Sequence, residues 1–181
     1  YLLLFGMLFE WLTLNKNSNL YSFKDWSLFL VGIFYVTTSM IFLLEHKQQP
    51  WIILWLFSIV WATDIGAYIV GSSLGGPKLA PRISPGKTWS GFLGGIIFGI
   101  AAGYTVSTYA SLSLPFGFLE TLFILTIAAQ IGDLIESKIK RHFNVKDSGH
   151  IIPGHGGLLD RLDSLLFVSF CYKLLLVFTK F

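Results

Sequence analysis

Hydrophobic residues form six long runs along the chain, separated by short polar segments. A helix that spans a membrane needs about 20 consecutive, mostly apolar residues. Six runs reach or approach this length: residues 1–14, 27–44, 51–73, 88–109, 116–136 and 158–178. The pattern therefore predicts an all-α fold, a polytopic bundle of about six transmembrane helices that forms a single membrane domain over residues 1–181.

The composition indicates lipid as the surrounding medium. Hydrophobic residues make up 54% of the chain and charged residues only 13%, whereas soluble domains carry roughly 25% charged residues. A lone cysteine, Cys171, excludes a disulfide scaffold or a cysteine-based zinc site. Because Tyr1 already lies in an apolar run, we expect further N-terminal sequence ahead of it.

Basic residues gather in three alternate polar segments. The segments after the first, third and fifth runs hold nine of the 13 Lys and Arg residues: Lys16, Lys24, Lys78, Arg82, Lys87, Lys138, Lys140, Arg141 and Lys146. The two segments between them hold one, Lys47. Cytoplasmic loops carry an excess of Lys and Arg, so we expect the three basic segments to face the cytoplasm.

The fourth run has a glycine at every fourth position, at Gly91, Gly95, Gly99 and Gly103. Small residues on one helix face let a second helix approach closely in lipid. The spacing predicts a packing face and permits a homodimer, but it leaves open whether the neighbour belongs to the same chain.

Carboxylates are concentrated near the basic side. Asp133 with Glu136, and Asp160 with Asp163, are spaced three residues apart, so each pair shares one helix face. Two such pairs at one membrane depth repel each other unless a cation lies between them. Arg161 meets this need in part, and Mg²⁺, which binds a few carboxylates together with phosphates, meets it better. The alternative is a network of salt bridges that only holds the bundle together. Glu10 and Glu120 are expected at the membrane interface.

The basic segments supply groups for binding phosphate. Lys87 follows a turn-like Ser84-Pro85-Gly86, and a glycine-rich run precedes the sixth helix. Glycine allows backbone N–H groups to surround an anion, and a helix N-terminus also favours one. The candidate phosphate contacts are Ser84, Lys87, Lys140, Arg141, Lys146, His155, Gly156, Gly157 and Arg161.

The residues 86–88, Gly-Lys-Thr, look like the end of a P-loop. A P-loop also needs glycine five residues before Gly86, where this chain has Pro81, and a preceding strand, which we do not expect here. We therefore reject this interpretation. Asp64, in the third run, is expected either to bind the metal or to pair with a lysine.

Residues 137–163 carry a long motif. It contains Lys140-Arg141, Lys146-Asp147, Ile152-Pro153, then His155 to Leu158 and Asp160 to Asp163. With Asp64, residues 84–91 and Asp133, this segment resembles the phosphatidate cytidylyltransferases, or CDP-diglyceride synthases. The resemblance covers residues 51–170, which we interpret as the cytidylyltransferase core.

The resemblance implies a reaction between CTP and phosphatidic acid that gives CDP-diacylglycerol and pyrophosphate. It implies Mg²⁺, with a second, monovalent cation such as K⁺, and it matches Asp133 and Asp160 to the metal-binding aspartates. We accordingly expect catalytic roles for Asp133, Asp160, Lys140, Arg141 and Arg161, and metal contacts from Asp133, Asp160, Asp163, Glu136 and Asp64.

Two other classes of protein were weighed against this interpretation. A CDP-alcohol phosphotransferase would need a helix motif of spaced aspartates that the chain lacks. An ion-coupled transporter would place its charges near the middle of the membrane, whereas here they gather at one side. We expect the lipid bilayer as the surroundings and no nucleic acid as a partner.

Overall fold

The computed structural model describes residues 1–16, 23–152 and 156–179. Within this part of the chain there are six helices: α1 (Leu2–Lys16), α2 (Phe23–Glu45), α3 (Pro50–Leu74), α4 (Trp89–Tyr109), α5 (Phe118–His142) and α6 (Leu159–Phe178). They coincide with the six apolar runs, which confirms the predicted all-α helical fold.

Four of the helices described are long and apolar enough to cross a membrane: Asp25–Glu45, Pro50–Leu74, Trp89–Tyr109 and Phe118–His142. The apolar part of α1, Leu2–Leu14, is shorter, and α6 contains Asp160, Arg161, Asp163 and Lys173. By these criteria four of the six described helices qualify as membrane spans, and α1 and α6 complete the predicted bundle of about six helices. Large apolar side chains such as Phe34, Trp61 and Ile97 are exposed, as expected for an integral membrane protein.

The structure adds a short β-hairpin between α3 and α4 that the sequence analysis did not predict. Strands β1 (Lys78–Ala80) and β2 (Ser84–Thr88) pair antiparallel, with Lys78 opposite Thr88. The expectation that no strand precedes Gly86 was therefore wrong, although Pro81 still excludes a P-loop. Gly75 and Gly76 have φ angles of 61° and 101°, a left-handed conformation that favours glycine, and they turn the chain from α3 into the hairpin.

The glycine face of α4 packs against α3 of the same chain. A Cβ atom on Gly91 would lie 2.7 Å from the carbonyl oxygen of Ala67, and one on Gly95 would lie 2.9 Å from that of Thr63. Any side chain here would push the two backbones apart. The helix that packs on the glycine face therefore belongs to the same chain, and the face gives no support to a homodimer.

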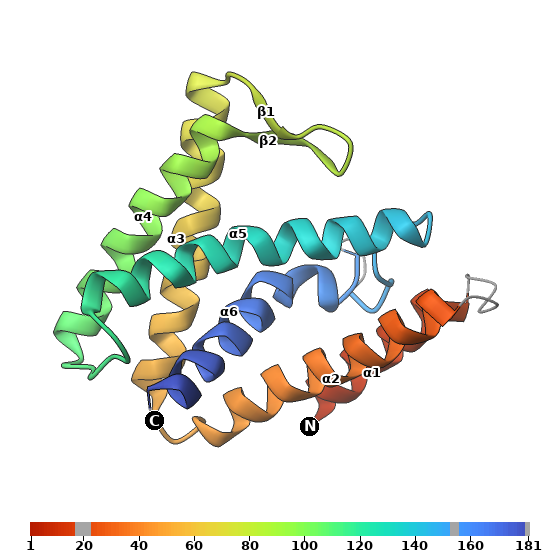
Figure 1. Ribbon diagram of the computed structural model, residues 1–181, viewed down its shortest axis with the longest axis horizontal. Coiled ribbons are helices and arrows are strands. Elements are labelled where there is room, and N and C mark those ends of the chain that lie inside the picture. The colour runs from red at the N-terminus through yellow and green to blue at the C-terminus, as the bar shows by residue number, and fades with distance from the viewer. Residues whose placement is uncertain (17–22, 153–155, 180–181) are drawn as a thin grey trace.

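Figure 1 shows how the elements are arranged. Helices α3 and α4 form a pair that α5 crosses, α6 lies between α5 and α2, and α1 runs beside α2. The hairpin extends from the α3–α4 pair on the same side of the view as the segment that follows α5, while the α2–α3 and α4–α5 connections lie on the opposite side. The basic hairpin and the basic end of α5 therefore share one side of the molecule.

Candidate active site

The polar end of α5 presents one face to its neighbours. Asp133, Glu136 and Lys140 follow one another at intervals of three and four residues, which places them on one side of the helix. Helix α6 comes very close to this helix at Gly132, where a Cβ atom would lie 2.6 Å from the Cβ of Phe167. This close packing brings the first two turns of α6 beside the charged face of α5.

Three carboxylates meet at this contact. Oxygen atoms of Asp133, Glu136 and Asp163 all lie within 4.8 Å of one another, and we call these residues the acidic triad. The Oε1 atom of Glu136 is buried and has no hydrogen-bond partner in the part of the chain described. Three carboxylates held so close repel one another unless a cation joins them, and their oxygens are the ligands that Mg²⁺ prefers. The residues present therefore fit a divalent metal.

Two lysines reach the triad from different elements. Lys87, on strand β2, lies 2.5 Å from Oδ2 of Asp133, so the unpredicted hairpin carries a cation to α5. The hairpin is fixed to α4 by Thr88, whose Oγ1 accepts a hydrogen bond from the N–H of Gly91 at 3.1 Å. Lys140 lies 2.7 Å from Oε2 of Glu136.

Lys140 also connects the triad to Asp160. Its Nζ atom lies 2.7 Å from Oδ1 of Asp160, whose Oδ2 accepts hydrogen bonds from the N–H groups of Ser148 and Gly157, each at 2.8 Å. Burial opposes ionisation of Asp160, but these bonds outweigh it and hold its pKa below the ordinary value. Asp160 is therefore anchored to the segment that precedes α6, with one oxygen directed at Lys140.

A pocket of about 550 Å³ with four charged residues in its lining lies on the hairpin side of the triad, and we call it the polar pocket. Asp64, Lys78, Lys87 and Asp133 line it, together with backbone of Gly75, Gly76 and Gly86. It is bounded by α3, the hairpin and α5. Asp64 thus shares a pocket with both a lysine and a carboxylate of the triad.

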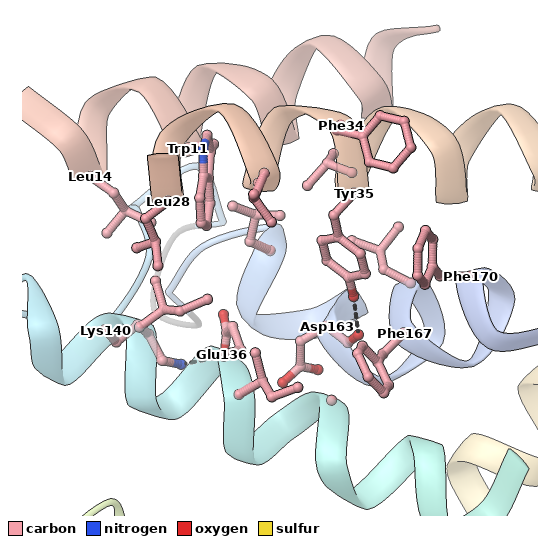
Figure 2. Close-up of a pocket in the computed structure, with 18 residues that line it drawn as sticks. Trp11, Leu14, Leu28, Phe34, Tyr35, Glu136, Lys140, Asp163, Phe167 and Phe170 are labelled. Atoms are coloured by element: carbon pink, nitrogen blue, oxygen red, sulfur yellow. Dashed lines mark hydrogen bonds and ion pairs between the residues drawn. The ribbon is translucent and has the colours of Figure 1, made fainter. Parts of the chain in front are cut away.

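An apolar pocket of about 400 Å³ lies on the opposite side, between α1, α2, α5 and α6. Figure 2 shows Leu28, Phe34 and Phe170 around it, with Glu136, Lys140 and Asp163 at its polar edge. The hydroxyl of Tyr35 donates a hydrogen bond to the backbone carbonyl of Asp163 at 3.3 Å. The acidic triad therefore has a polar pocket on one side and an apolar pocket on the other.

The other residues that the sequence predicts as phosphate contacts lie at several separate places in the structure. Arg141, Lys146 and Arg161 are exposed, and Arg141 donates to the carbonyl of Val145 at 3.2 Å. Ser84 lies in β2, half-buried. Gly156 has a φ of 81°, and the N–H of Gly157 points to Asp160. His155 lies outside the described residues.

Glu10 is the polar residue that the sequence analysis misjudged. It was expected at the membrane interface, but it is only 1% exposed and accepts hydrogen bonds from the N–H groups of Leu158 and Leu159, both at 2.8 Å. The anion site predicted at the start of α6 is thus occupied by a carboxylate of the protein. An ionisable residue in the middle of an apolar helix was the available signal, because such residues seldom lack a polar partner.

Comparison with known proteins gives a consistent result. The model of the cytidylyltransferase family matches residues 1–179. A phosphatidate cytidylyltransferase of Brucella suis biovar 1 (strain 1330) is 48% identical over 139 residues, 75% of this chain. Proteins of the same name from Staphylococcus saprophyticus and Bacillus subtilis (strain 168) are 42% and 52% identical over 173 and 124 residues, 94% and 67% of the chain.

The matched part is shorter than these relatives. It covers 52% of the Brucella protein, 66% of the Staphylococcus protein and 46% of the Bacillus protein. The family match, in contrast, runs through all six helices, including the α1 that carries Glu10. The chain belongs to the cytidylyltransferase family.

Proposed function

We propose that this protein transfers CMP from CTP to phosphatidic acid, giving CDP-diacylglycerol and pyrophosphate. The observation that carries the proposal is the position of the acidic triad, with the polar pocket on one side and the apolar pocket on the other. A reaction that joins a water-soluble nucleotide to a lipid needs a polar pocket for the nucleotide and an apolar pocket for the lipid, on either side of one charged centre. The names of the relatives agree with this proposal.

The polar pocket is proposed to hold CTP. Its size is within the range of pockets that bind small molecules, roughly 300–1,000 Å³. Lys78 and Lys87 supply positive charge for the triphosphate, and the glycines around them let phosphate oxygens approach the backbone. Ser84, on the same strand as Lys87, is proposed as a further phosphate contact.

The apolar pocket is proposed to hold an acyl chain of phosphatidic acid. Its lining side chains from α2 and α6 are mostly aliphatic or aromatic, and its polar edge holds Lys140. A lipid seated here with its tail along α2 would bring its phosphate towards Lys140 and the triad. Arg141, Lys146 and Arg161, which are exposed, are proposed to complete the phosphate contacts from the surface. His155, Gly156 and Gly157 are proposed as further phosphate contacts.

The chemistry requires charge stabilisation more than proton transfer. An oxygen of the lipid phosphate forms a bond to the α-phosphorus of CTP, the bond from that phosphorus to the bridging oxygen of the β-phosphate breaks, and its electron pair leaves with pyrophosphate. The attacking oxygen is already ionised, so no strong base is needed. Lys87 and Lys140 stand where they can stabilise the charge that develops on the phosphates.

We propose Mg²⁺ as the metal of the triad, with Asp160 and Asp64 as further carboxylate contacts and a monovalent cation such as K⁺ beside it. When bound, the divalent ion neutralises phosphate charge during transfer. The unpartnered Oε1 of Glu136 supports this assignment. By the positive-inside rule, the site is proposed to face the cytoplasm at a bacterial-type inner membrane.

An ion-coupled transporter is not favoured. Transporters place their ionisable groups near the middle of the membrane, whereas Asp133 and Glu136 lie in the half of α5 that ends at Lys140, Arg141 and His142. The homodimer remains a prediction that needs support from a face other than the glycines of α4.

The test is an assay with CTP labelled at the α-phosphate and phosphatidic acid, using the protein in lipid nanodiscs. We expect label in the lipid and one pyrophosphate released per labelled lipid, both lost when a chelator removes Mg²⁺ and restored when Mg²⁺ is returned. CTP without phosphatidic acid serves as the control and should release no pyrophosphate. Release of inorganic phosphate in place of pyrophosphate would contradict the proposal.

A further inference from the structure

Glu10 is a buried carboxylate outside the acidic triad and both pockets. It lies in the apolar helix α1 and is 1% exposed. Burying a carboxylate costs several kcal/mol unless donors replace the lost water. Here three donors do so: the N–H groups of Leu158 and Leu159, each at 2.8 Å, and the hydroxyl of Ser148 at 3.2 Å. All three lie in residues 148–152 and 156–159, the described residues that precede and begin α6, which we call the signature segment.

The segment is shaped to receive this carboxylate. A Cβ atom on Gly149 would lie 2.7 Å from Oε1 of Glu10, and one on Gly157 would lie 2.8 Å from Oε2. Neither position has room for a side chain while Glu10 is in place. Leu158, at the N-cap of α6, offers no side-chain cap, so a carboxylate from another helix satisfies these N–H groups and complements the helix dipole.

The same segment holds the charged groups of the site. Ser148 donates its hydroxyl to Glu10 and its N–H to Asp160. Asp160 also accepts from Gly157 and contacts Lys140. A continuous set of bonds therefore runs from Glu10 through the segment to Asp160, and through Lys140 to Glu136.

We propose that Glu10 is a positioning residue for the active site. It fixes the start of α6 and residues 148–152 and 156–159, so that Asp160 meets Lys140 and Asp163 meets Asp133 and Glu136. Helix α1 then contributes to the geometry of the active site through Glu10. The kinetic part of this inference rests on the proposed function, whereas the structural part does not.

The test compares Glu10→Gln with Met7→Ala. Gln keeps the size of Glu10 but replaces one acceptor oxygen by an NH₂ group that faces N–H donors. Met7 is a fully buried residue one turn earlier in α1 and belongs to its apolar packing, so Met7→Ala weakens α1 without touching the bonds of Glu10.

We expect Glu10→Gln to lower kcat by about 10–100-fold, as loss of a contact that orients a metal ligand does. KM for CTP should stay unchanged, because the polar pocket is built from other elements. Amide hydrogen exchange in residues 148–152 and 156–159 should become faster. Met7→Ala should lower the unfolding temperature, and it should change kcat per folded molecule and this exchange much less than Glu10→Gln does, because the three bonds of Glu10 remain.

Parental kcat in a folded Glu10→Gln variant would overturn the proposal, as would an equal loss of kcat in Met7→Ala. If Glu10→Gln does not fold, Ser148→Ala removes one of the three bonds and should give a smaller change in the same direction; faster exchange with parental kcat would overturn the proposal. The exchange measurement needs no substrate, so it tests the contact even where the parent shows no CMP transfer.

Discussion

Glu10 and Glu136 are both largely buried glutamates on apolar helices, but they meet different surroundings. Both oxygens of Glu10 accept hydrogen bonds from backbone N–H groups or a hydroxyl. Glu136 has one oxygen without a hydrogen-bond partner among the described residues and two further carboxylates beside it. A buried carboxylate whose bonds are complete organises the chain around it. One whose bonds are incomplete, in a group of like charges, is suited to a ligand.

Asp160 resembles Glu10 in one of its oxygens and Glu136 in the other. Its Oδ2 is held by two backbone N–H groups, as Glu10 is, while its Oδ1 contacts the Lys140 that also neutralises Glu136. Substitution of these residues should therefore separate effects on stability from effects on turnover.

The largest effect is expected for Asp133→Asn. It removes one carboxylate of the triad and should abolish CMP transfer, a loss greater than the roughly 10–100-fold that an outer contact to a metal ligand contributes. The free energy of unfolding should change little, because the relief of repulsion in the triad offsets the loss of the ion pair with Lys87. Unfolding temperature and turnover measured on the same preparation check this, and a large loss of stability would contradict it.

Asp160→Asn should lower both the free energy of unfolding and the rate of CMP transfer. The variant loses the charge that Lys140 contacts and weakens the bonds to Ser148 and Gly157, so the free energy of unfolding should fall by about 1–3 kcal/mol. CMP transfer should fall with it. Denaturant unfolding beside the turnover assay makes the comparison with Asp133→Asn, and parental stability would show that Asp160 does not anchor the segment.

Lys87→Met is expected to weaken mainly the binding of CTP. It removes a charge from the polar pocket, and KM for CTP should rise by about 10-fold, the equivalent of about 1.4 kcal/mol, while KM for phosphatidic acid stays constant. Lys47→Met, an exposed position in the α2–α3 connection, is the matched control and should change neither. Equal effects of the two substitutions would exclude Lys87 from the CTP site.

The smallest expected effect is a dependence on pH of the stability that Asp160 contributes. The pKa of Asp160 in the folded chain is lowered, so its contribution to stability is present above the ordinary aspartate pKa of about 4 and is lost as the pH falls through the folded value. The difference in unfolding free energy between the parent and Asp160→Asn should therefore shrink below about pH 4. A difference that grows on acidification would contradict the hydrogen-bond pattern at Asp160.

Much of the fold followed from hydrophobic runs, because a helix in lipid needs a continuous apolar segment. The hairpin did not, since Lys78–Ala80 and Ser84–Thr88 are short, contain Pro85 and Gly86, and carry little apolar alternation. The carboxylates near the basic side were also visible in the sequence. Their exact grouping was not, because spacing along a helix does not fix how α5 and α6 are rotated against each other.

The role of Glu10 depends on contacts across almost the whole chain. Its partners lie 138 to 149 residues away, so the place of Glu10 in the apolar helix α1 indicates a polar partner but not which residues supply it. Lys140 was predicted as a phosphate contact, and its position between Glu136 and Asp160 became visible only once α6 lay beside α5.

The central claim is that the acidic triad holds a divalent cation between the two pockets. Binding of Mn²⁺, followed by electron paramagnetic resonance on the parent and on Asp133→Asn, tests it without any substrate. We expect one saturable site in the parent that is lost in the variant, with both proteins unfolding at the same temperature. Equal Mn²⁺ affinity in the two proteins would contradict the claim.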